Sequence, residues 1–393
     1  MRIRPLSFGS LLGRGLALTL AIWSLTNPAL AAPSLTLLEQ LAPYGQSRPF
    51  AINNAGQIAG LQFDLDLPYT SVIWQGSQIS TNISASLNPP PGAIRNFAPQ
   101  DINDAGIVSG QLVQRGISPC LATLCASAAQ WDGSQATTLP GSLTTGFPHP
   151  SALSINDHGH IAGFVRAGAS LHRATLWRDG SATDLGTLGG TVSLARAINN
   201  AGVIVGNSST SGNSNSRATL WQGGGIFDLG TLGGNFGAAN DLNEKNQIVG
   251  SSDTADGMSR ATLWDNGAII DLGSFAGSSA AFAINENGVI VGSADGRAAM
   301  WKGGVITDLN NFLSAQQKAE GWYLTEATGI NDKGWIIGIG TNPLFDQTRA
   351  FLLTSAVPEP GSYLMSIIGL AMLAVVLRRS ARGRGNALSV TPG

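Results

Sequence analysis

Positive charge is scarce in the part of this chain that has the composition of a folded domain. Residues 33–356 hold 15 basic and 23 acidic side chains, and only four of the basic ones are lysine. Nucleic-acid binding depends on clustered Lys and Arg that neutralise phosphates. The composition therefore excludes nucleic acid as a partner. It suits a soluble extracellular protein with an acidic surface rich in Gly, Ser, Thr and Asn.

Cysteine is almost absent, because the chain has Cys120 and Cys125 and no other. In an oxidising compartment, an even pair at this spacing predicts a local disulfide. Such a bond closes a small loop and adds little stability through chain entropy. A structural zinc site needs four ligands, which two cysteines without nearby histidines do not supply. We therefore expect a disulfide and no cofactor.

Residues 33–356, which we call the body, also lack the motifs of common enzyme classes. The body has no Gly-x-Ser-x-Gly sequence, no Cys–His nucleophile setting and no pair of carboxylates outside a repeated pattern. The glycine-rich segment 186–190 lacks the Lys-Ser/Thr and the following helix that phosphate binding requires. Helical periodicity is missing except over 313–322. These absences favour an all-β, non-enzymatic protein.

The first 32 residues have the layout of a secretory signal peptide. The basic residues that precede the apolar stretch 16–25 are Arg2, Arg4 and Arg14. A small-x-small cleavage site follows at residues 29–31, so we expect processing at Ala31 and Ala32. A buried N-terminal helix is the alternative, but the three-part pattern predicts export.

A second targeting pattern lies near the C-terminus. An uncharged run of 17 residues, 361–377, follows Val357, Pro358, Glu359 and Pro360 and precedes Arg378 and Arg379. Its length is near the lower limit for crossing a bilayer. Arginines after the run favour a cytoplasmic C-terminus. We therefore expect a transmembrane helix within 357–379 and a basic cytoplasmic tail over 380–393.

This order of Pro-Glu-Pro, short apolar run and basic cluster resembles the PEP-CTERM sorting signal of Gram-negative bacteria. The resemblance implies that an exosortase cuts an inner-membrane intermediate near Pro358–Pro360. The body is then released or re-anchored at the cell surface. The tail beyond the basic cluster is longer than is usual in that signal. A plain membrane anchor is the alternative.

One phrase recurs seven times in the body. Its first copy reads Ile-Asn-Asn-Ala-Gly-Gln-Ile-Ala-Gly, and successive copies begin 42–53 residues apart. The copies begin at Ile52, Ile102, Ile155, Ile198, Leu242, Ile284 and Ile330. The fullest copies contain four short strand-like segments separated by turns, which is the size of a β-propeller blade. The repeat therefore predicts a seven-bladed β-propeller of four-stranded blades over residues 33–356.

The two ends of the repeat predict how the ring closes. The pattern stops at residues 349–354, so the last copy has no fourth strand. The segment 35–41 stands before the first phrase as the fourth strand of a full copy stands before the next phrase. It can supply the missing outer strand and remove an exposed sheet edge. We expect 35–41 to pair antiparallel with 349–354.

A tryptophan occupies one strand position in six copies, where it stands just before a hairpin turn that contains glycine. These residues are Trp74, Trp131, Trp177, Trp221, Trp264 and Trp301, and the seventh copy has Arg349-Ala350-Phe351-Leu352-Leu353 instead. A large aromatic side chain at a fixed strand position is most simply a packing anchor between blades. A row of exposed rings that stack on carbohydrate is the alternative.

The motifs Ala-Thr-Leu-Trp, Asp-Leu-Gly-Thr-Leu-Gly-Gly and Ala-Ile-Asn-x-x-Gly-x-Ile-Val-Gly resemble the HAF-repeat family of bacterial extracellular proteins. Residues 173–308 match these motifs closely, and copies one, two and seven match more loosely. The resemblance implies an exported repeat protein without a defined biochemical role. It implies no catalytic residues.

Four Arg/Asp pairs, each separated by 11 residues, recur in the central copies. They are Arg173 with Asp184, Arg217 with Asp228, Arg260 with Asp271, and Arg297 with Asp308. Across a hairpin, this spacing places the two side chains diagonally on one face. A catalytic site would occur once, so repetition in successive blades favours structural ion pairs.

Two alternatives would place a metal in the turns. The Asn-Asp turns at residues 103–106, 156–159 and 331–334 resemble calcium loops only faintly, since the alternating acidic residues are missing. His158 and His160 could chelate a metal from one strand end, although two turn histidines are more often solvated. Turn chemistry explains both segments, so we expect no metal site.

The longest departures from the repeat fall in the first three copies. They cover 62–70, 82–100, 111–125 and 139–151, and these connection types open on the same face of a propeller. We expect a non-enzymatic protein that acts in the extracellular matrix, with exopolysaccharide or a surface protein as partner. The alternative is a glycan-active lyase or hydrolase that uses this loop-rich face.

Overall fold

The structure is a computed structural model of the 393-residue chain. It describes residues 33–41, 45–64, 67–121, 123–142, 144–145, 150–168 and 171–354. Contacts divide the chain into two units, residues 35–354 and the terminal residues 1–34 with 355–393. The expected signal peptide, sorting signal and cytoplasmic tail lie outside the described residues. Within the described ranges, no helix has both the length and the apolar character needed to cross a bilayer.

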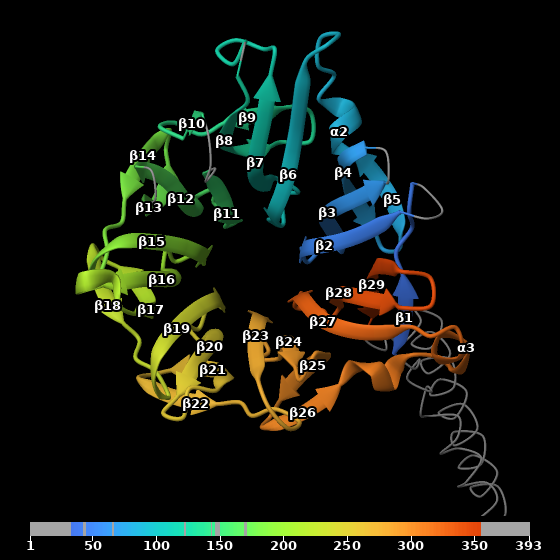
Figure 1. The fold of residues 1–393 in the computed structure, drawn as a ribbon, viewed down its shortest axis with the longest axis vertical. Helices are drawn as coiled ribbons and strands as arrows, with labels where there is room; N and C mark the ends of the chain where they lie inside the picture. Colours follow the sequence, from blue (N-terminus) through green and yellow to red (C-terminus); the bar gives the residue numbers. More distant parts are fainter. Residues whose placement is uncertain are drawn as a thin grey trace, which may run out of the picture. The chain divides into compact units, whose positions relative to one another are not determined.

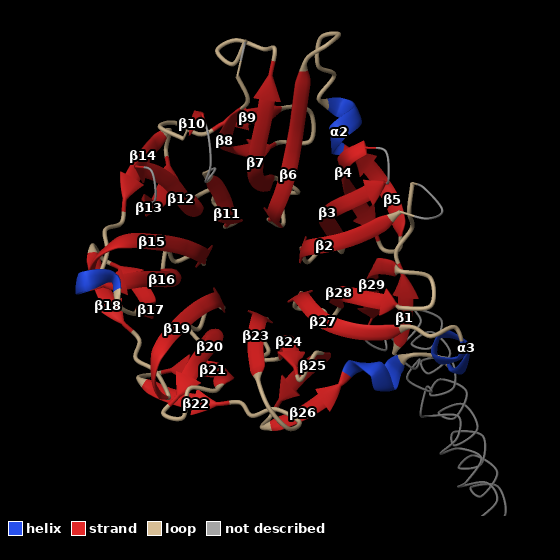
Figure 2. Cartoon of the chain, in the orientation of Figure 1, coloured by secondary structure: helices blue, strands red, loops and turns tan. Residues whose placement is uncertain are grey.

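Seven antiparallel sheets surround a central channel (Figures 1 and 2), which confirms the predicted seven-bladed β-propeller. Blade one consists of β2 (Gln46–Ile52), β3 (Gln57–Asp64), β4 (Leu67–Gln75) and β5 (Gln78–Asn82). Blade two consists of β6 (Ile94–Ile102), β7 (Val108–Arg115), β8 (Cys125–Trp131), β9 (Ala136–Thr138) and β10 (Thr144–Thr145). Blade three consists of β11 (Ser151–Ile155), β12 (Ile161–Gly168), β13 (Leu171–Arg178) and β14 (Ser181–Asp184).

The remaining blades follow the repeat more closely. Blade four consists of β15 (Gly189–Ile198), β16 (Ile204–Thr210), β17 (Ser216–Gln222) and β18 (Gly225–Asp228). Blade five consists of β19 (Gly233–Leu242), β20 (Ile248–Thr254), β21 (Ser259–Asp265) and β22 (Ala268–Asp271). Blade six consists of β23 (Ser279–Ile284), β24 (Ile290–Ala294), β25 (Arg297–Lys302) and β26 (Val305–Asp308). Blade seven consists of β27 (Tyr323–Ile330), β28 (Ile336–Asn342), β29 (Gln347–Thr354) and β1 (Ser34–Leu37).

Helical structure is confined to short pieces between strands. They are α2 (Ile83–Ser86), η1 (Ser211–Asn213), η2 (Leu309–Phe312) and α3 (Ala315–Ala319). α3 lies within the one segment where the sequence has helical periodicity, and Ser314 and Gln317 form a capping box at its start. Blade two departs from four strands, because β9 and β10 both pair with β8.

The inner strand of every blade carries a β-bulge just before its Ile-Asn phrase, and blade four illustrates why. The register between β15 and β16 shifts between Ala195 and Ala197. A Cβ at Gly206 would collide with the carbonyl oxygen of Leu194 on the bulged strand. Only glycine tolerates this close backbone approach. The glycine that ends each copy of the phrase is therefore a requirement of the bulge opposite it.

The N-terminal strand closes the ring, as the sequence predicts. β1 is hydrogen-bonded to β29 at the outer edge of blade seven. The Leu38 N–H donates to the Ala350 carbonyl at 2.9 Å, and Arg349 Nη2 donates to the Leu38 carbonyl at 2.7 Å. β1 ends at Leu37, so it is shorter than the expected segment 35–41. Closure joins the two ends of the body, and β1 covers the edge that β29 would otherwise expose.

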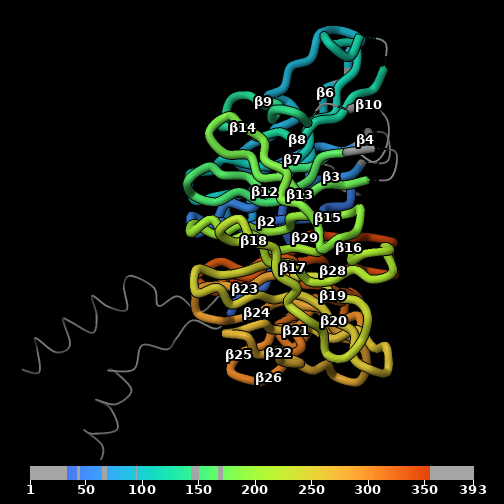
Figure 3. The backbone as a smooth tube through the Cα atoms, turned by 90° about the vertical axis from the view of Figure 1, so that its left-hand side faces the viewer, coloured from blue at the N-terminus to red at the C-terminus, as the bar shows by residue number. Residues whose placement is uncertain are grey.

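The core is divided into clusters between neighbouring blades (Figure 3 shows the ring from the side). The six predicted tryptophan anchors are 0–4% exposed, which confirms packing and contradicts a row of exposed rings. Trp221, for example, packs with Ala174 of blade three and with Ile198 of its own blade. In blade seven Leu353 takes the equivalent position, because it pairs with Ile336 as Trp221 pairs with Ile204, and Phe351, two residues earlier, is fully buried in the same junction. Each junction therefore contains at least one large buried aromatic ring.

Trp221→Ala should lower the free energy of unfolding by about 3–5 kcal/mol, because it removes a buried aromatic ring and leaves a cavity. Phe227→Ala is the matched control, since Phe227 lies in the same blade but is 51% exposed. We expect the control to change stability by less than about 1 kcal/mol. Chemical denaturation followed by circular dichroism measures both values. Equal stability of the two variants would contradict the role of Trp221 as an anchor.

Candidate functional site: the central channel

The first asparagine of the phrase is buried in all seven blades. These residues are Asn53, Asn103, Asn156, Asn199, Asn243, Asn285 and Asn331, each 3–5% exposed. In blade four, Asn199 Oδ1 accepts the Val203 N–H at 3.0 Å, which fixes the turn between β15 and β16. The same bond, to the residue four positions later, forms at 2.9–3.0 Å in the other six blades. The side chain thus stabilises its own turn first.

The other end of each amide connects neighbouring blades. Each Asn Nδ2 donates to the backbone carbonyl of the equivalent asparagine in the next blade, at 2.9–3.3 Å. The series includes the bond from Asn331 of blade seven to Asn53 of blade one at 3.0 Å. It therefore forms a closed circle of seven buried hydrogen bonds, which we call the amide ring.

A second circle runs through the residue that follows each amide-ring asparagine. Its members are Asn54, Asp104, Asp157, Asn200, Glu244, Glu286 and Asp332. The backbone N–H of each member donates to a side-chain oxygen of the member in the next blade, at 2.7–3.0 Å. We call this circle the outer ring. It too closes between blades seven and one, because Asp332 N–H donates to Asn54 Oδ1 at 2.9 Å.

Both rings line a cavity of about 240 Å³ at one end of the channel. Five of the seven outer-ring side chains are carboxylates, so this mouth of the channel is strongly acidic. Each carboxylate already accepts a backbone N–H from the preceding blade, and this bond explains its position in the turn. The Asn-Asp turns that resemble calcium loops supply three of these carboxylates. Their oxygens serve as caps for the neighbouring blade.

Deeper in the channel, a second cavity of about 220 Å³ contains Asp101, Ser154, Arg196 and Asp241. The two aspartates and Ser154 each directly follow the bulge residue of their inner strand. Asp241 Oδ1 accepts the Leu242 N–H at 2.8 Å, and Oδ2 accepts the Ile284 N–H of the next blade at 2.9 Å. Asp101 makes the same two types of bond and also accepts the Ser154 hydroxyl at 2.9 Å.

These buried aspartates are the groups of the channel with shifted acidity. Burial raises the pKa of Asp241 to about 7, and the charges of Asp101 and Glu286 add to the shift. Burial also raises the pKa of Asp101. The hydrogen bonds from Ile155, Ile102 and Ser154 act to lower this pKa, and the charge of Asp157 acts to raise it. Burial lowers the pKa of the Arg196 guanidinium, whose Nε donates to Asn207 Oδ1 at 3.0 Å. The channel can therefore take up or release a proton near neutral pH.

Three of the four expected Arg/Asp pairs lie within ion-pair distance. Arg173 Nε is 3.3 Å from Asp184 Oδ2, Arg217 Nε is 3.6 Å from Asp228 Oδ2, and Arg297 Nη1 is 3.2 Å from Asp308 Oδ2. The expectation is wrong for Arg260 and Asp271, because Arg260 Nη1 instead donates to the hydroxyl of Ser274 at 2.7 Å. All three pairs are partly exposed, so each contributes little to stability.

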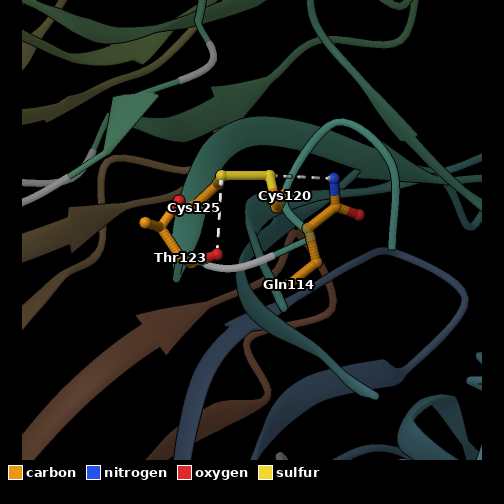
Figure 4. Close-up of a disulfide and its surroundings, with 4 residues drawn as sticks. All are labelled: Gln114, Cys120, Thr123 and Cys125. Carbon is orange, nitrogen blue, oxygen red and sulfur yellow. Dashed lines mark hydrogen bonds between the residues drawn. A yellow bond between two sulfur atoms is a disulfide. The ribbon is translucent and has the colours of Figure 1, made fainter. Parts of the chain in front are cut away.

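Cys120 and Cys125 form a disulfide at the edge of blade two (Figure 4). It closes the connection between β7 and the start of β8. Gln114 Nε2 lies 3.7 Å from Cys120 Sγ, and Cys125 Sγ lies 3.9 Å from the Thr123 carbonyl oxygen. The bond ties down one of the long connections of the loop-rich face.

The two turn histidines lie beside each other without further metal-ligand residues. The rings of His158 and His160 are stacked with centroids 5.9 Å apart. His172 is at a different place, edge-on to Phe164 at 5.0 Å. In the part of the chain that the structure describes, no group of three His, Cys, Asp or Glu residues could hold a metal.

Sequence reasoning did not identify the amide ring or the two channel aspartates. The recurrence of Asn at one position was visible, but it was interpreted only as turn chemistry. The aspartates carried a further signal, because Asp101 and Asp241 replace the small residue that precedes the phrase in most copies. A charged residue at a position that otherwise holds Ala, Gly or Ser marks a polar environment at that point of the strand.

A family model for the PEP-CTERM protein-sorting motif matches residues 356–380. This match confirms the predicted sorting motif and indicates an exported protein that an exosortase processes. A sequence comparison with curated proteins finds no match.

The solved structures that match are only distantly similar to this chain. The extracellular domain of a putative hybrid two-component system from B. thetaiotaomicron is 11% identical, with a TM-score of 0.46 over 82% of this chain and 40% of its own length. TolB from Acinetobacter baumannii is 10% identical, with a TM-score of 0.36 over 79% of this chain and 63% of its own length. This chain thus spans less than two thirds of either protein, and the blade assignment rests on its own strand pairing.

Asp241→Asn should weaken the pH dependence of stability between pH 5 and pH 8. The folded-state pKa is raised, so the unfolded chain releases its proton first as the pH rises above about 4. Asp241 therefore favours folding below that pH, and the contribution is lost as the pH passes through about 7. Removing the group should reduce the loss between pH 5 and pH 8 by about 1–2 kcal/mol, a value discounted for water in the channel.

Denaturation at both pH values, for the wild type and for Asp241→Asn, measures this difference. Asp179→Asn is the control, because Asp179 is an exposed turn residue with a positive φ that asparagine also accepts. The slope of the free energy of unfolding against pH is compared between proteins, so a loss of stability that is the same at both pH values, caused by the altered hydrogen bonds of the variant, does not affect the result. Identical slopes in the wild type and the Asp241 variant would contradict a raised pKa.

Proposed function

We propose that the chain is an exported β-propeller that is placed at the cell surface or in the extracellular matrix of a Gram-negative bacterium. Residues 1–32 act as the signal peptide, and the run 361–377 holds an inner-membrane intermediate as a transmembrane helix. An exosortase then cuts near Val357–Pro360. The observation that carries this proposal is the match of residues 356–380 to the sorting motif.

The propeller body has a non-enzymatic binding or structural role in that location. Support comes from the use of its polar groups: the amide ring, the outer ring and the channel aspartates are all engaged in bonds between blades. A body built in this way is a rigid scaffold, and binding is left to its surface. The resemblance of residues 173–308 to HAF repeats fits an extracellular role. Exopolysaccharide or another surface protein is the partner class that suits an acidic matrix protein.

A glycan-active lyase or hydrolase on the loop-rich face is the second function considered from the sequence. The described part of that face has the disulfide between Cys120 and Cys125 as its clearest feature. A disulfide orders a loop, and it provides no general acid or base. We therefore place the binding role first.

Expression with and without the host exosortase tests the sorting step. We expect the mass of the mature body to end near Val357–Pro360 only when the exosortase is present, because the enzyme removes the apolar run. Replacing Pro358 and Glu359 together by alanine should leave the C-terminus intact in the same host. Mass spectrometry of the body measures both. An intact C-terminus in the wild-type host would leave a plain tail anchor and contradict the sorting proposal.

The binding role is tested with the released body and the exopolysaccharide of the same host. We expect the polymer to retain the body without becoming shorter. Retention is measured by sedimentation with the polymer, and chain length by size-exclusion chromatography. A decrease in polymer length would favour the enzyme, and neither retention nor cleavage would leave exopolysaccharide without support as a partner.

A further inference from the structure

The grooves between neighbouring blades differ in whether the buried indole N–H of the tryptophan anchor has a hydrogen-bond acceptor. A leucine at the end of each outer strand marks the groove, because its N–H donates to an alanine carbonyl of the strand beside it. The equivalent bonds start from Leu38, Leu139, Leu185, Leu229 and Leu272, each at 2.8–2.9 Å. The tryptophan anchor of the next blade lies on the other side of the groove. These five grooves can therefore be compared position by position.

In two of these grooves, the main-chain carbonyl of the residue after the leucine accepts a hydrogen bond from the indole N–H of the tryptophan anchor. Trp74 Nε1 donates to the Glu39 carbonyl at 2.8 Å, between blades seven and one. Trp177 Nε1 donates to the Pro140 carbonyl at 3.0 Å, between blades two and three. In both grooves the acceptor is a main-chain carbonyl of a segment that passes along the groove.

In the regular blades, a glycine replaces Glu39 and Pro140. Gly186, Gly230 and Gly273 have φ values of +78° to +79°, and the N–H of each donates to the aspartate two residues earlier at 2.8 Å. This turn directs the chain away from the course that residues 38–41 follow. The indole nitrogens of Trp221, Trp264 and Trp301 are buried, and none has a hydrogen-bond partner in the described chain.

Two of these grooves also contain a cavity. The groove between blades three and four has a volume of about 380 Å³ and is lined by Leu176, Leu185 and Trp221 together with the hairpin 222–225. The groove between blades four and five has a volume of about 200 Å³, is lined mainly by apolar groups and includes Leu229 and Trp264. We call them groove 3/4 and groove 4/5. A buried donor without an acceptor beside an apolar cavity is energetically unfavourable, and an acceptor supplied by a ligand removes that cost.

The filled groove between blades seven and one indicates what fits such a cavity. Leu38 is fully buried there beside Trp74. The Glu39 N–H donates to the Ser77 carbonyl at 2.9 Å, and the Ile79 N–H donates to Glu39 Oε2 at 2.6 Å. The segment that follows Leu38 thus pairs with the hairpin of blade one and provides the carbonyl for the indole. Leu185 and Leu229 already take the place of Leu38 in grooves 3/4 and 4/5, so these grooves lack only that extended segment, and their apolar lining leaves room for a side chain of it.

We propose that grooves 3/4 and 4/5 bind an extended segment of a partner polypeptide, with an apolar side chain in the cavity and a main-chain carbonyl on the indole of Trp221 or Trp264. The partner is of protein class because this chain's own polypeptide makes the equivalent contacts in two grooves of the same ring. The proposal deepens the binding role proposed above and selects a surface protein as partner.

The test uses a peptide that copies residues 39–41, Glu-Gln-Leu, with blocked ends, because β14 with Leu185 and β18 with Leu229 already take the course of residues 35–38 in these grooves. The released body is labelled with ¹⁵N, and the indole N–H signals are assigned with the variants Trp221→Phe and Trp264→Phe. We expect the signals of Trp221 and Trp264 to move downfield with saturation as the peptide is added. The Trp74 signal should not move, because its N–H is already bonded to Glu39.

Two variants separate the hydrogen bond from packing. Trp221→Phe keeps a ring in groove 3/4 and should weaken peptide binding there three- to tenfold, as expected for the loss of one hydrogen bond. A peptide whose Glu carbonyl is reduced to a methylene should lose affinity for the wild-type protein by a similar factor. At groove 3/4 of the Trp221→Phe variant, the reduced and the unmodified peptide should bind with the same affinity.

Unchanged signals of Trp221 and Trp264 at millimolar peptide would overturn the proposal. A shift of Trp74 alone would also overturn it, because the peptide would then be displacing the N-terminal strand. Shifts caused by host oligosaccharide and not by peptide would assign the grooves to glycan. Retention of the body by exopolysaccharide without any peptide shift would leave the binding role intact and remove only this proposal.

Discussion

The amide ring is the interaction on which the rest of the structure depends. Each buried asparagine uses its oxygen to hold its own turn and its nitrogen to hold the turn of the next blade. A buried amide must satisfy both groups, so the turn and the junction form together. Seven identical steps close between Asn331 and Asn53, and the number of blades and the width of the channel follow from that closure.

Around this inner ring, the blades are joined by contacts that vary more from one junction to the next. The tryptophan anchors fill the junctions farther from the channel, and the N-terminal strand closes blade seven at its outer edge. Partly exposed Arg/Asp pairs add little. The amide ring is therefore the same at all seven junctions, whereas the outer grooves differ from one another. This division explains how one ring can present both filled and open grooves.

Much of the fold could be predicted from the repeat itself. The period, the tryptophan that precedes a glycine-containing hairpin turn and the missing fourth strand were enough to predict seven blades closed by residues near the N-terminus. Contacts between blades were harder, because they join residues about 42–53 positions apart through geometry that no single copy contains. Arg260 illustrates this limit: its partner is the Ser274 hydroxyl, which competes with Asp271. The unpartnered indole of Trp221 likewise depends on Gly186 of the preceding blade.

The comparison of Asn199→Ala with Asn200→Ala tests the central claim most directly. Asn199→Ala leaves the Val203 N–H and the Asn243 carbonyl without their partner, so we expect a loss of about 2–4 kcal/mol in the free energy of unfolding. Asn200, its neighbour in the outer ring, is partly exposed, so water can replace its bonds and its replacement should cost less than half as much. Equilibrium denaturation measures both values. Equal losses for the two variants would contradict the amide ring as the interaction that holds the blades together.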